Sequence, residues 1–143
     1  MAPLHLWLAI CHARDEGSAR HWILILAEEG AHNGTWYHST GGPTMNKPYK
    51  VEIQTKRVNS HGIDSHHSIA EISDKHKNKV KAAVQAISPK FCQRWTVDVL
   101  AELERKGLVP NGTSANWYLA MENDPYSDDG APSIQYDFAG PSS

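Results

Sequence analysis

Short apolar runs separated by polar turns fill the first half of the chain, which is the pattern of an antiparallel sheet. Residues 4–11 and 21–26 are predicted strands, and the second is apolar on both faces, as expected of a strand in the middle of a sheet. A hairpin loop over 28–34, with an Asn-Gly turn signal inside it, leads to a third predicted strand over 35–39. Residues 49–55 alternate between apolar and polar side chains and predict a fourth strand at an edge of the sheet.

A first helix is predicted over residues 74–87, because apolar side chains recur there every three or four positions. Ser73 and Asp74 are placed to cap its start. The lysines of this segment fall between the apolar positions, so we expect them on a solvated face rather than in a phosphate-binding site. The apolar stripe consists of Val80, Ala83, Val84 and Ile87.

The second predicted helix runs over 89–106 and has the clearest helical pattern of the chain. Ser88 is placed to cap it, Pro89 suits its first position, and Gly107 is a stop signal behind two basic residues. Its apolar positions are 92, 95, 99, 100 and 103. Cys92 therefore falls in or near the first turn, where unpaired backbone N–H groups and the helix dipole favour an anion such as a thiolate and lower its pKa when a cation lies nearby.

The remaining segments carry weaker patterns. Residues 59–68 are polar, rich in histidine and without periodicity, which predicts a loop. Residues 116–121 predict one more strand, and residues 122–143 have the composition of a polar, mobile tail. We therefore expect a single α+β domain over 1–121, with an antiparallel sheet of four to five strands packed against two helices.

The composition is that of a globular protein, with 40% hydrophobic and 21% charged residues. A formal net charge of −2 argues against nucleic-acid and acidic-membrane partners, since proteins that bind either usually have a basic surface. No apolar run approaches the roughly 20 residues of a transmembrane helix, and the run over 4–11 reads as a strand rather than a leader. Cys11 and Cys92 are too few for a disulfide framework, so we expect a reducing, cytoplasmic setting.

Two histidines are expected close to each other. His21 opens the predicted strand over 21–26, and antiparallel pairing with 35–39 brings His38 near it. A cysteine nucleophile needs a histidine that takes its proton and a third group that orients this histidine. The alternative is that Cys92 is an ordinary core thiol on the apolar face of its helix, which is also how we interpret Cys11.

The order of these residues resembles that of the permuted papain-like hydrolases, in particular the lecithin:retinol acyltransferase and phospholipase A/acyltransferase families related to NlpC-type peptidases. Their pattern is a strand that begins His-Trp or His-Tyr, a hairpin that ends in an apolar residue and His, and a later Asn-Cys-Glu-His-Phe that opens a helix. The matching segments here are 21–26, 36–38 and 91–95. The resemblance implies a circularly permuted papain-like fold with Cys92 as nucleophile, His21 as base and His38 as the residue that orients the base.

The resemblance further implies acyl transfer through an acyl-enzyme. Phe91 stands where the family has Asn, Gln93-Arg94 stand where it has Glu-His, and the family's apolar membrane-binding segment has no counterpart. We therefore expect a thiol hydrolase or acyltransferase that needs no cofactor or metal and acts on a small-molecule or peptide substrate. The acyl group is expected to be held in a soluble ester, thioester or amide rather than a phospholipid. The expected substrate-binding residues are Trp22, Trp36, Gln93 and Trp95.

Three other functions fit some of the same residues. A catalytically silent binding module on the same fold would explain Phe91 in place of Asn. A nuclease would use His21 and His38 as acid and base. Its phosphate ligand would be Arg20 or Arg94. A zinc or copper site would draw on the polar, histidine-rich part of the chain, where the potential ligands are His61, Asp64, His66, His67 and His76.

Overall fold

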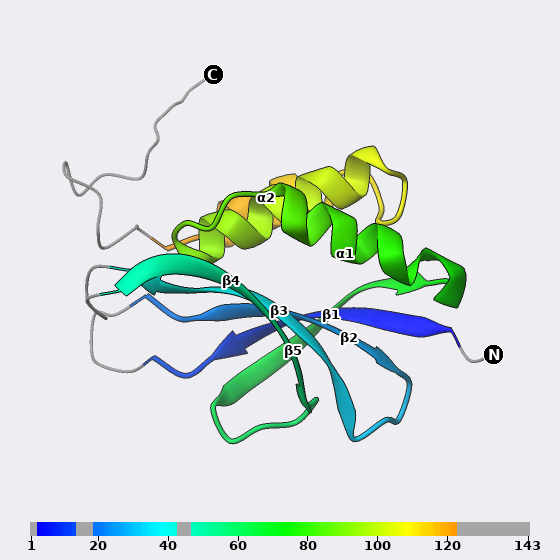
Figure 1. The fold of residues 1–143 in the computed structure, drawn as a ribbon, viewed down its shortest axis with the longest axis horizontal. Coiled ribbons are helices and arrows are strands. Elements are labelled where there is room, and N and C mark those ends of the chain that lie inside the picture. Colours follow the sequence, from blue (N-terminus) through cyan, green and yellow to red (C-terminus); the bar gives the residue numbers. More distant parts are fainter. Residues whose placement is uncertain (1–2, 14–18, 43–46, 123–143) are drawn as a thin grey trace.

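One antiparallel sheet of five strands organises the computed structural model, which describes residues 3–13, 19–42 and 47–122 (Figure 1). The strands are β1 (Leu4–Cys11), β2 (Trp22–Glu28), β3 (Asn33–Gly42), β4 (Lys47–Arg57) and β5 (Ile63–Ile72). They lie in the order β4–β3–β2–β1–β5, so the sheet is open and its edges are β4 and β5. The prediction of an α+β fold with an antiparallel sheet is confirmed.

β2 is the central strand, as its apolar residues on both faces predict. Residues 22–27 are all buried. Their even-numbered side chains join the main core under the helices, whereas Ile23 and Ile25 pack on the opposite face with Trp36 of β3. Alternation along the strand therefore assigns His21, which comes directly before β2, to the face of Ile23 and Ile25.

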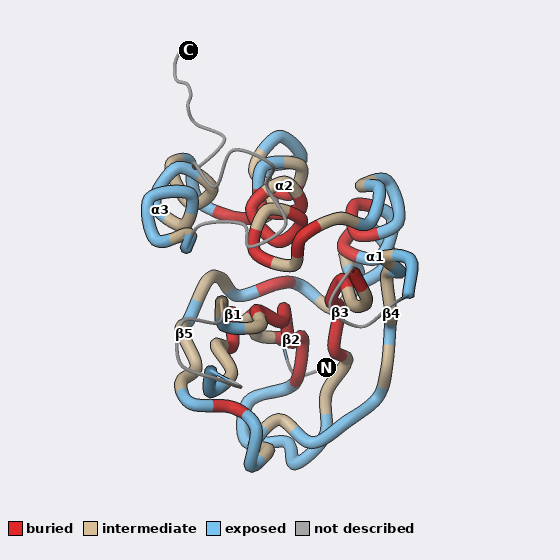
Figure 2. The backbone as a smooth tube through the Cα atoms, turned by 90° about the vertical axis from the view of Figure 1, so that its left-hand side faces the viewer, coloured by how far each residue is buried: buried red, intermediate tan, exposed pale blue. Residues whose placement is uncertain are grey.

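Within the described residues, three α-helices cover one face of this sheet: α1 (Lys77–Ala86), α2 (Cys92–Arg105) and α3 (Thr113–Ala120). They lie side by side with α2 in the middle (Figure 2). A 3₁₀ turn over Asp74–His76 leads into α1, and Ser73 makes no side-chain capping bond to it. The lysines of this region are exposed, as predicted. The core residues of α2 are Trp95, Val97, Val99, Leu100 and Leu103.

β5 occupies most of the segment predicted as a loop, so that prediction is wrong from Ile63 onward. The strand pairs with β1 at the edge of the sheet, where polar side chains are tolerated on both faces. These side chains have partners: His5 Nε2 is 2.7 Å from Ser68 Oγ, and His66 Nε2 is 2.7 Å from the backbone O of Val58. Backbone pairing with β1 thus forms this strand without an apolar alternation in its sequence.

The strand predicted over 116–121 is also wrong, because residues 116–120 belong to α3. The helix follows Gly112, whose φ of 94° turns the chain sharply. Its first turn is capped from α2, since Glu104 Oε1 accepts hydrogen bonds from the backbone N and the hydroxyl of Ser114 at 2.9 and 3.0 Å. Contacts from another helix leave no local signal, so the predicted two helices become three within the part of the chain that the structure describes.

α2 begins later than predicted. Cys92 is its first residue and Phe91 its N-cap, whereas Ser88 and Pro89 lie outside the helix. The predicted end is confirmed, because Gly107 follows with a φ of 78°. The later start places Cys92 directly at the helix N-terminus.

The predicted tail over 122–143 lies outside the described residues, with the exception of Glu122. In the three described ranges, the structure contains no helix of the length and apolar character needed to cross a membrane.

Replacement of Gly41 by alanine should destabilise the fold more than the same change at Gly30. Both glycines have a left-handed backbone, with φ of 91° and 81°. A Cβ at position 41 would lie 2.2 Å from the backbone O of Pro48, whereas a Cβ at position 30 meets nothing within 4 Å. Urea unfolding should show a loss of about 1 kcal/mol for Gly30→Ala, from backbone strain alone. The loss for Gly41→Ala should be about 3 kcal/mol or more, and equal losses would contradict the close approach of β3 and β4.

Candidate functional site

Cys92 lies at the N-terminus of α2, beside the start of β2. Its half-buried thiol donates a hydrogen bond to the backbone O of Arg20 at 3.8 Å. The backbone N–H groups of Trp22 and Gln93 hydrogen-bond to the sulfur. The thiol therefore contacts the residues on both sides of His21 and faces backbone donors from two elements, an arrangement suited to holding negative charge.

The turn before α2 is fixed to β3. Ser39, which follows His38, donates its hydroxyl to the backbone O of Lys90 at 2.6 Å and accepts from the backbone N of Lys90 at 3.2 Å. Lys90 Nζ is in turn 2.7 Å from Asp98 Oδ2 on α2. Because Ser39 is buried, these bonds form a rigid connection between the turn that carries Cys92 and the strand that carries His38.

A chain of side-chain hydrogen bonds crosses three strands from His21. The structure places His21 Nε2 2.8 Å from Nδ1 of His38, as the expected hairpin pairing requires. The other ring nitrogen of His38, Nε2, is 2.9 Å from Oε1 of Gln54 on β4. Gln54 Nε2 donates to Glu52 Oε1 at 3.1 Å. His21, which follows the residue that accepts the hydrogen bond of the Cys92 thiol, is thus the first member of a continuous polar network.

Burial dominates the ionisation of the site. It raises the pKa of the Cys92 thiol to about 11, although hydrogen bonds from the backbone of Trp22 and Gln93 oppose the rise. The lowered pKa expected from the helix terminus is therefore wrong, because removal of water from the sulfur outweighs the helix dipole. Burial also lowers the pKa of His38, opposed by the hydrogen bond to Gln54 and the charge of Glu52. Both groups are uncharged at neutral pH.

Gln93 ties α2 to both ends of the site. Its Nε2 donates to the backbone O of Arg20 at 2.9 Å and to Glu122 Oε1 at 2.8 Å, and its Oε1 accepts from the backbone N of Glu122 at 2.6 Å. Glu122 Oε1 also accepts from the backbone N of Arg20 at 2.8 Å. The Gln93 amide is fully buried, and these hydrogen bonds within the protein link α2 to the start of β2 and to Glu122.

The three tryptophans expected to bind substrate are core residues. Trp22 and Trp95 are buried between the sheet and the helices, and Trp95 Nε1 donates to the backbone O of Ile87 at 3.2 Å. Trp36 is buried on the opposite face of the sheet, where its Nε1 donates to the backbone O of Arg57 at 3.1 Å. Their indoles fill the two cores instead of lining an open apolar pocket.

Three residues of the site were not identified from the sequence. Gln54 and Glu52 share one face of β4, and the register pairs His38 with Glu52. Alternation in the predicted strand over 49–55, combined with pairing to 35–39, is the signal that identifies them. Glu122 lies in the segment interpreted as a tail, and no sequence signal connects it to Gln93.

The residues of the alternative metal site point to separate partners. His66 bonds to Val58, His67 Nε2 is 3.0 Å from Ser65 Oγ, and Asp64 forms ion pairs with His12 and Arg20. Among the residues that the structure describes, no group of three or more His, Cys, Asp or Glu could hold a metal ion.

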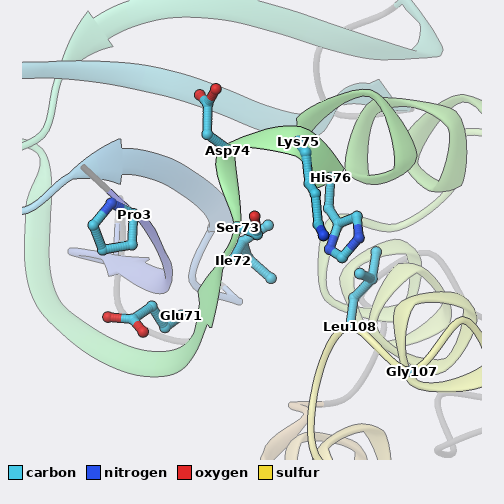
Figure 3. A pocket seen from close by; sticks show the side chains of 9 residues that line it. All are labelled: Pro3, Glu71, Ile72, Ser73, Asp74, Lys75, His76, Gly107 and Leu108. Atoms are coloured by element: carbon cyan, nitrogen blue, oxygen red, sulfur yellow. The ribbon is translucent and has the colours of Figure 1, made fainter. Parts of the chain in front are cut away.

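Two pockets lie away from Cys92. One, of about 620 Å³, is lined by residues 71–76 and by Pro3, Gly107 and Leu108, near the start of β1 (Figure 3). The other, of about 750 Å³, surrounds the turn between β2 and β3 and includes Trp7 and His66. Cys92, His21 and His38 line neither pocket, because these residues gather near the opposite end of β1, beside Cys11.

Residues 6–110 match a family of unknown function, DUF6540, and the chain belongs to this family. The matched region contains Cys92, His21, His38 and Gln54, and it ends before α3. No curated protein and no solved structure matches the chain significantly.

The Cys92 thiol should ionise with an apparent pKa near 11, well above the ordinary value of about 8.5. Because the pKa in the folded state is raised, the neutral thiol contributes stability that is complete below the ordinary value and is lost as the pH rises toward 11. Ultraviolet absorbance of the thiolate, followed against pH in a Cys11→Ser variant, measures this directly. The double variant Cys11→Ser, Cys92→Ser supplies the baseline, and a thiolate already formed at neutral pH would contradict the burial of the sulfur.

Proposed function

We propose that this protein is a thiol hydrolase or acyltransferase that acts on a soluble ester, thioester or amide through an acyl-enzyme. One observation carries the proposal: the Cys92 thiol, at the N-terminus of α2, hydrogen-bonds to the residue before His21, and His21 contacts His38 at 2.8 Å. In the proposed mechanism Cys92 is the nucleophile, His21 is the base and His38 orients the base.

The neutral thiol determines how the reaction would proceed. His21 takes the proton of Cys92 as the sulfur attacks the carbonyl carbon, so that no resting thiolate is needed. The carbonyl oxygen becomes an oxyanion, which backbone N–H groups at the start of α2 would stabilise. The tetrahedral intermediate expels the alcohol, thiol or amine, which takes the proton from His21. Water or another acceptor then loses its proton to His21 and attacks the carbonyl carbon of the acyl-enzyme thioester. Collapse of this second intermediate releases the acid or the acylated acceptor, and the Cys92 sulfur takes the proton back from His21.

We further propose that the fold is a permuted papain-like one. The order of elements supports this: a strand with His21 at its head, a hairpin partner with His38, and a later helix that begins with Cys92 against the same antiparallel sheet. Both cysteines are free thiols, which agrees with a reducing, cytoplasmic setting.

A catalytically silent binding module on the same fold is the second candidate, and the raised pKa of Cys92 favours it. In a silent binding module Cys92 would be only a packed side chain and would need no base. A cysteine nucleophile, in contrast, needs a base that takes its proton. The role of His21 therefore separates the two functions.

Acylation of Cys92 by activated substrates tests the proposal. The Cys11→Ser protein, incubated with a panel of p-nitrophenyl esters and acyl thioesters, should gain one acyl group on Cys92, identified by intact mass and peptide mapping. His21→Ala should slow this acylation by about 10²–10⁴-fold, the usual contribution of a general base. His5→Ala is the matched control, because His5 lies near the start of β1 and the site lies near its end. This variant should leave the acylation rate unchanged. An acylation rate that His21→Ala does not alter would favour the silent module.

A further inference from the structure

The polar network at the site does not end at His38 but continues to the edge strand β4. Gln54 presents Oε1 to His38 at 2.9 Å, and Glu52 accepts from Gln54 Nε2 through one oxygen and from Thr40 Oγ1 through the other, at 3.1 and 2.7 Å. Each of these side chains has a distinct donor or acceptor capacity, so the direction of every bond can be derived.

Glu52 sets the first direction. The hydrogen bond from Thr40 holds the pKa of Glu52 below its ordinary value, so its side chain is a carboxylate that can only accept. Gln54 must therefore turn its NH₂ group toward Glu52. This orientation points the amide oxygen of Gln54, an acceptor, at Nε2 of His38.

The orientation of Gln54 determines the tautomers of the two histidines. His38 must carry its proton on Nε2, because it faces an acceptor there. Burial keeps His38 neutral, so its Nδ1 is a lone pair, and His21 must donate Nε2–H to it. His21 then holds its basic lone pair on Nδ1. The neutral tautomer that can accept a proton is thus selected three bonds away, on β4.

We propose that Gln54 and Glu52 are positioning residues that fix the tautomers of His38 and His21 and thereby make Nδ1 of His21 the base. The inference rests on the proposed function for its consequence, but the tautomers themselves can be measured without any reaction. The other groups that face His38 are Lys56 and Trp36, and neither takes part in the chain of bonds.

Replacement of the acceptor that position 54 presents to His38 by a donor provides the test. Gln54→Glu presents only acceptors to His38 and should keep the Nε2–H tautomer on both histidines. Gln54→Lys presents only donors, so His38 should move its proton to Nδ1 and His21 should become an Nδ1–H tautomer that cannot act as the base. Thr55→Lys, which adds the same charge on the exposed opposite face of β4, should keep both tautomers.

Long-range proton–nitrogen NMR spectra of the histidine rings, recorded above the pH at which they protonate, report each tautomer. The wild-type spectrum tests the proposed tautomer of His38 without any variant. A His38 that carries its proton on Nδ1 would overturn the proposal, even if the variants failed to fold. Unchanged tautomers in a folded Gln54→Lys protein would also overturn it.

Acylation of Cys92 reports the consequence. Gln54→Lys should slow acylation by about 10²-fold or more. Gln54→Glu should instead shift the low-pH limb of the rate profile upward, because a carboxylate beside His38 favours its protonated form. Failure of the proposed function is distinguishable: wild-type protein would then show the expected tautomers without acylation. Acylation with the opposite tautomers would support the enzyme and overturn the roles of Gln54 and Glu52.

Discussion

The contact between the first turn of α2 and the start of β2 is the interaction on which the candidate site depends. The backbone O of Arg20 accepts from both the Cys92 thiol and the Gln93 amide, and it immediately precedes His21. Trp95, one turn along the helix, is fully buried and anchors α2 in the core. Because each residue along a helix turns by about 100°, a shift of one residue would direct the thiol away from β2. The contact that docks the helix therefore also holds the Cys92 thiol beside the residue that precedes His21.

Two opposing electrostatic effects meet at Cys92. The helix N-terminus and nearby backbone N–H groups favour a thiolate, whereas burial against Arg20 and Trp22 favours the neutral thiol. Burial prevails, and the pKa rises to about 11. In the proposed mechanism, transfer of the thiol proton to His21 therefore accompanies attack on the carbonyl carbon. The proposal makes the tautomer of His21 more important than its charge, and it assigns the hydrogen bonds that continue to β4 the role of selecting that tautomer.

Much of the sheet could be predicted, because the pattern that identifies a strand is local. The apolar runs of β1 and β2 and the alternation in β4 each lie within a few residues, and the Asn-Gly signal marks the hairpin between β2 and β3. β5 and α3 could not be predicted in this way. β5 owes its form to backbone pairing with β1, and α3 is capped by Glu104 from α2, so both depend on contacts distant in sequence.

The same distinction between local signals and distant contacts applies to the candidate site. Pairing within the hairpin brings His21 to His38, and strand register extends the set to Gln54 and Glu52. The position of Cys92 beside Arg20 depends instead on how α2 docks against the sheet. Burial of the thiol and the bonds from Gln93 to Glu122 depend on the complete three-dimensional packing, which explains why the expected lowering of the Cys92 pKa was wrong and why the contacts of Gln93 were not predicted.

The most direct measurement of the central claim is the rate at which iodoacetamide alkylates Cys92 near neutral pH, in Cys11→Ser protein with and without His21→Ala. If His21 takes the proton of the neutral thiol, the protein that retains His21 should react about 10²-fold faster or more than the His21→Ala variant. Equal rates in the two folded proteins would mean that Cys92 and His21 do not act as a pair, and would contradict the account.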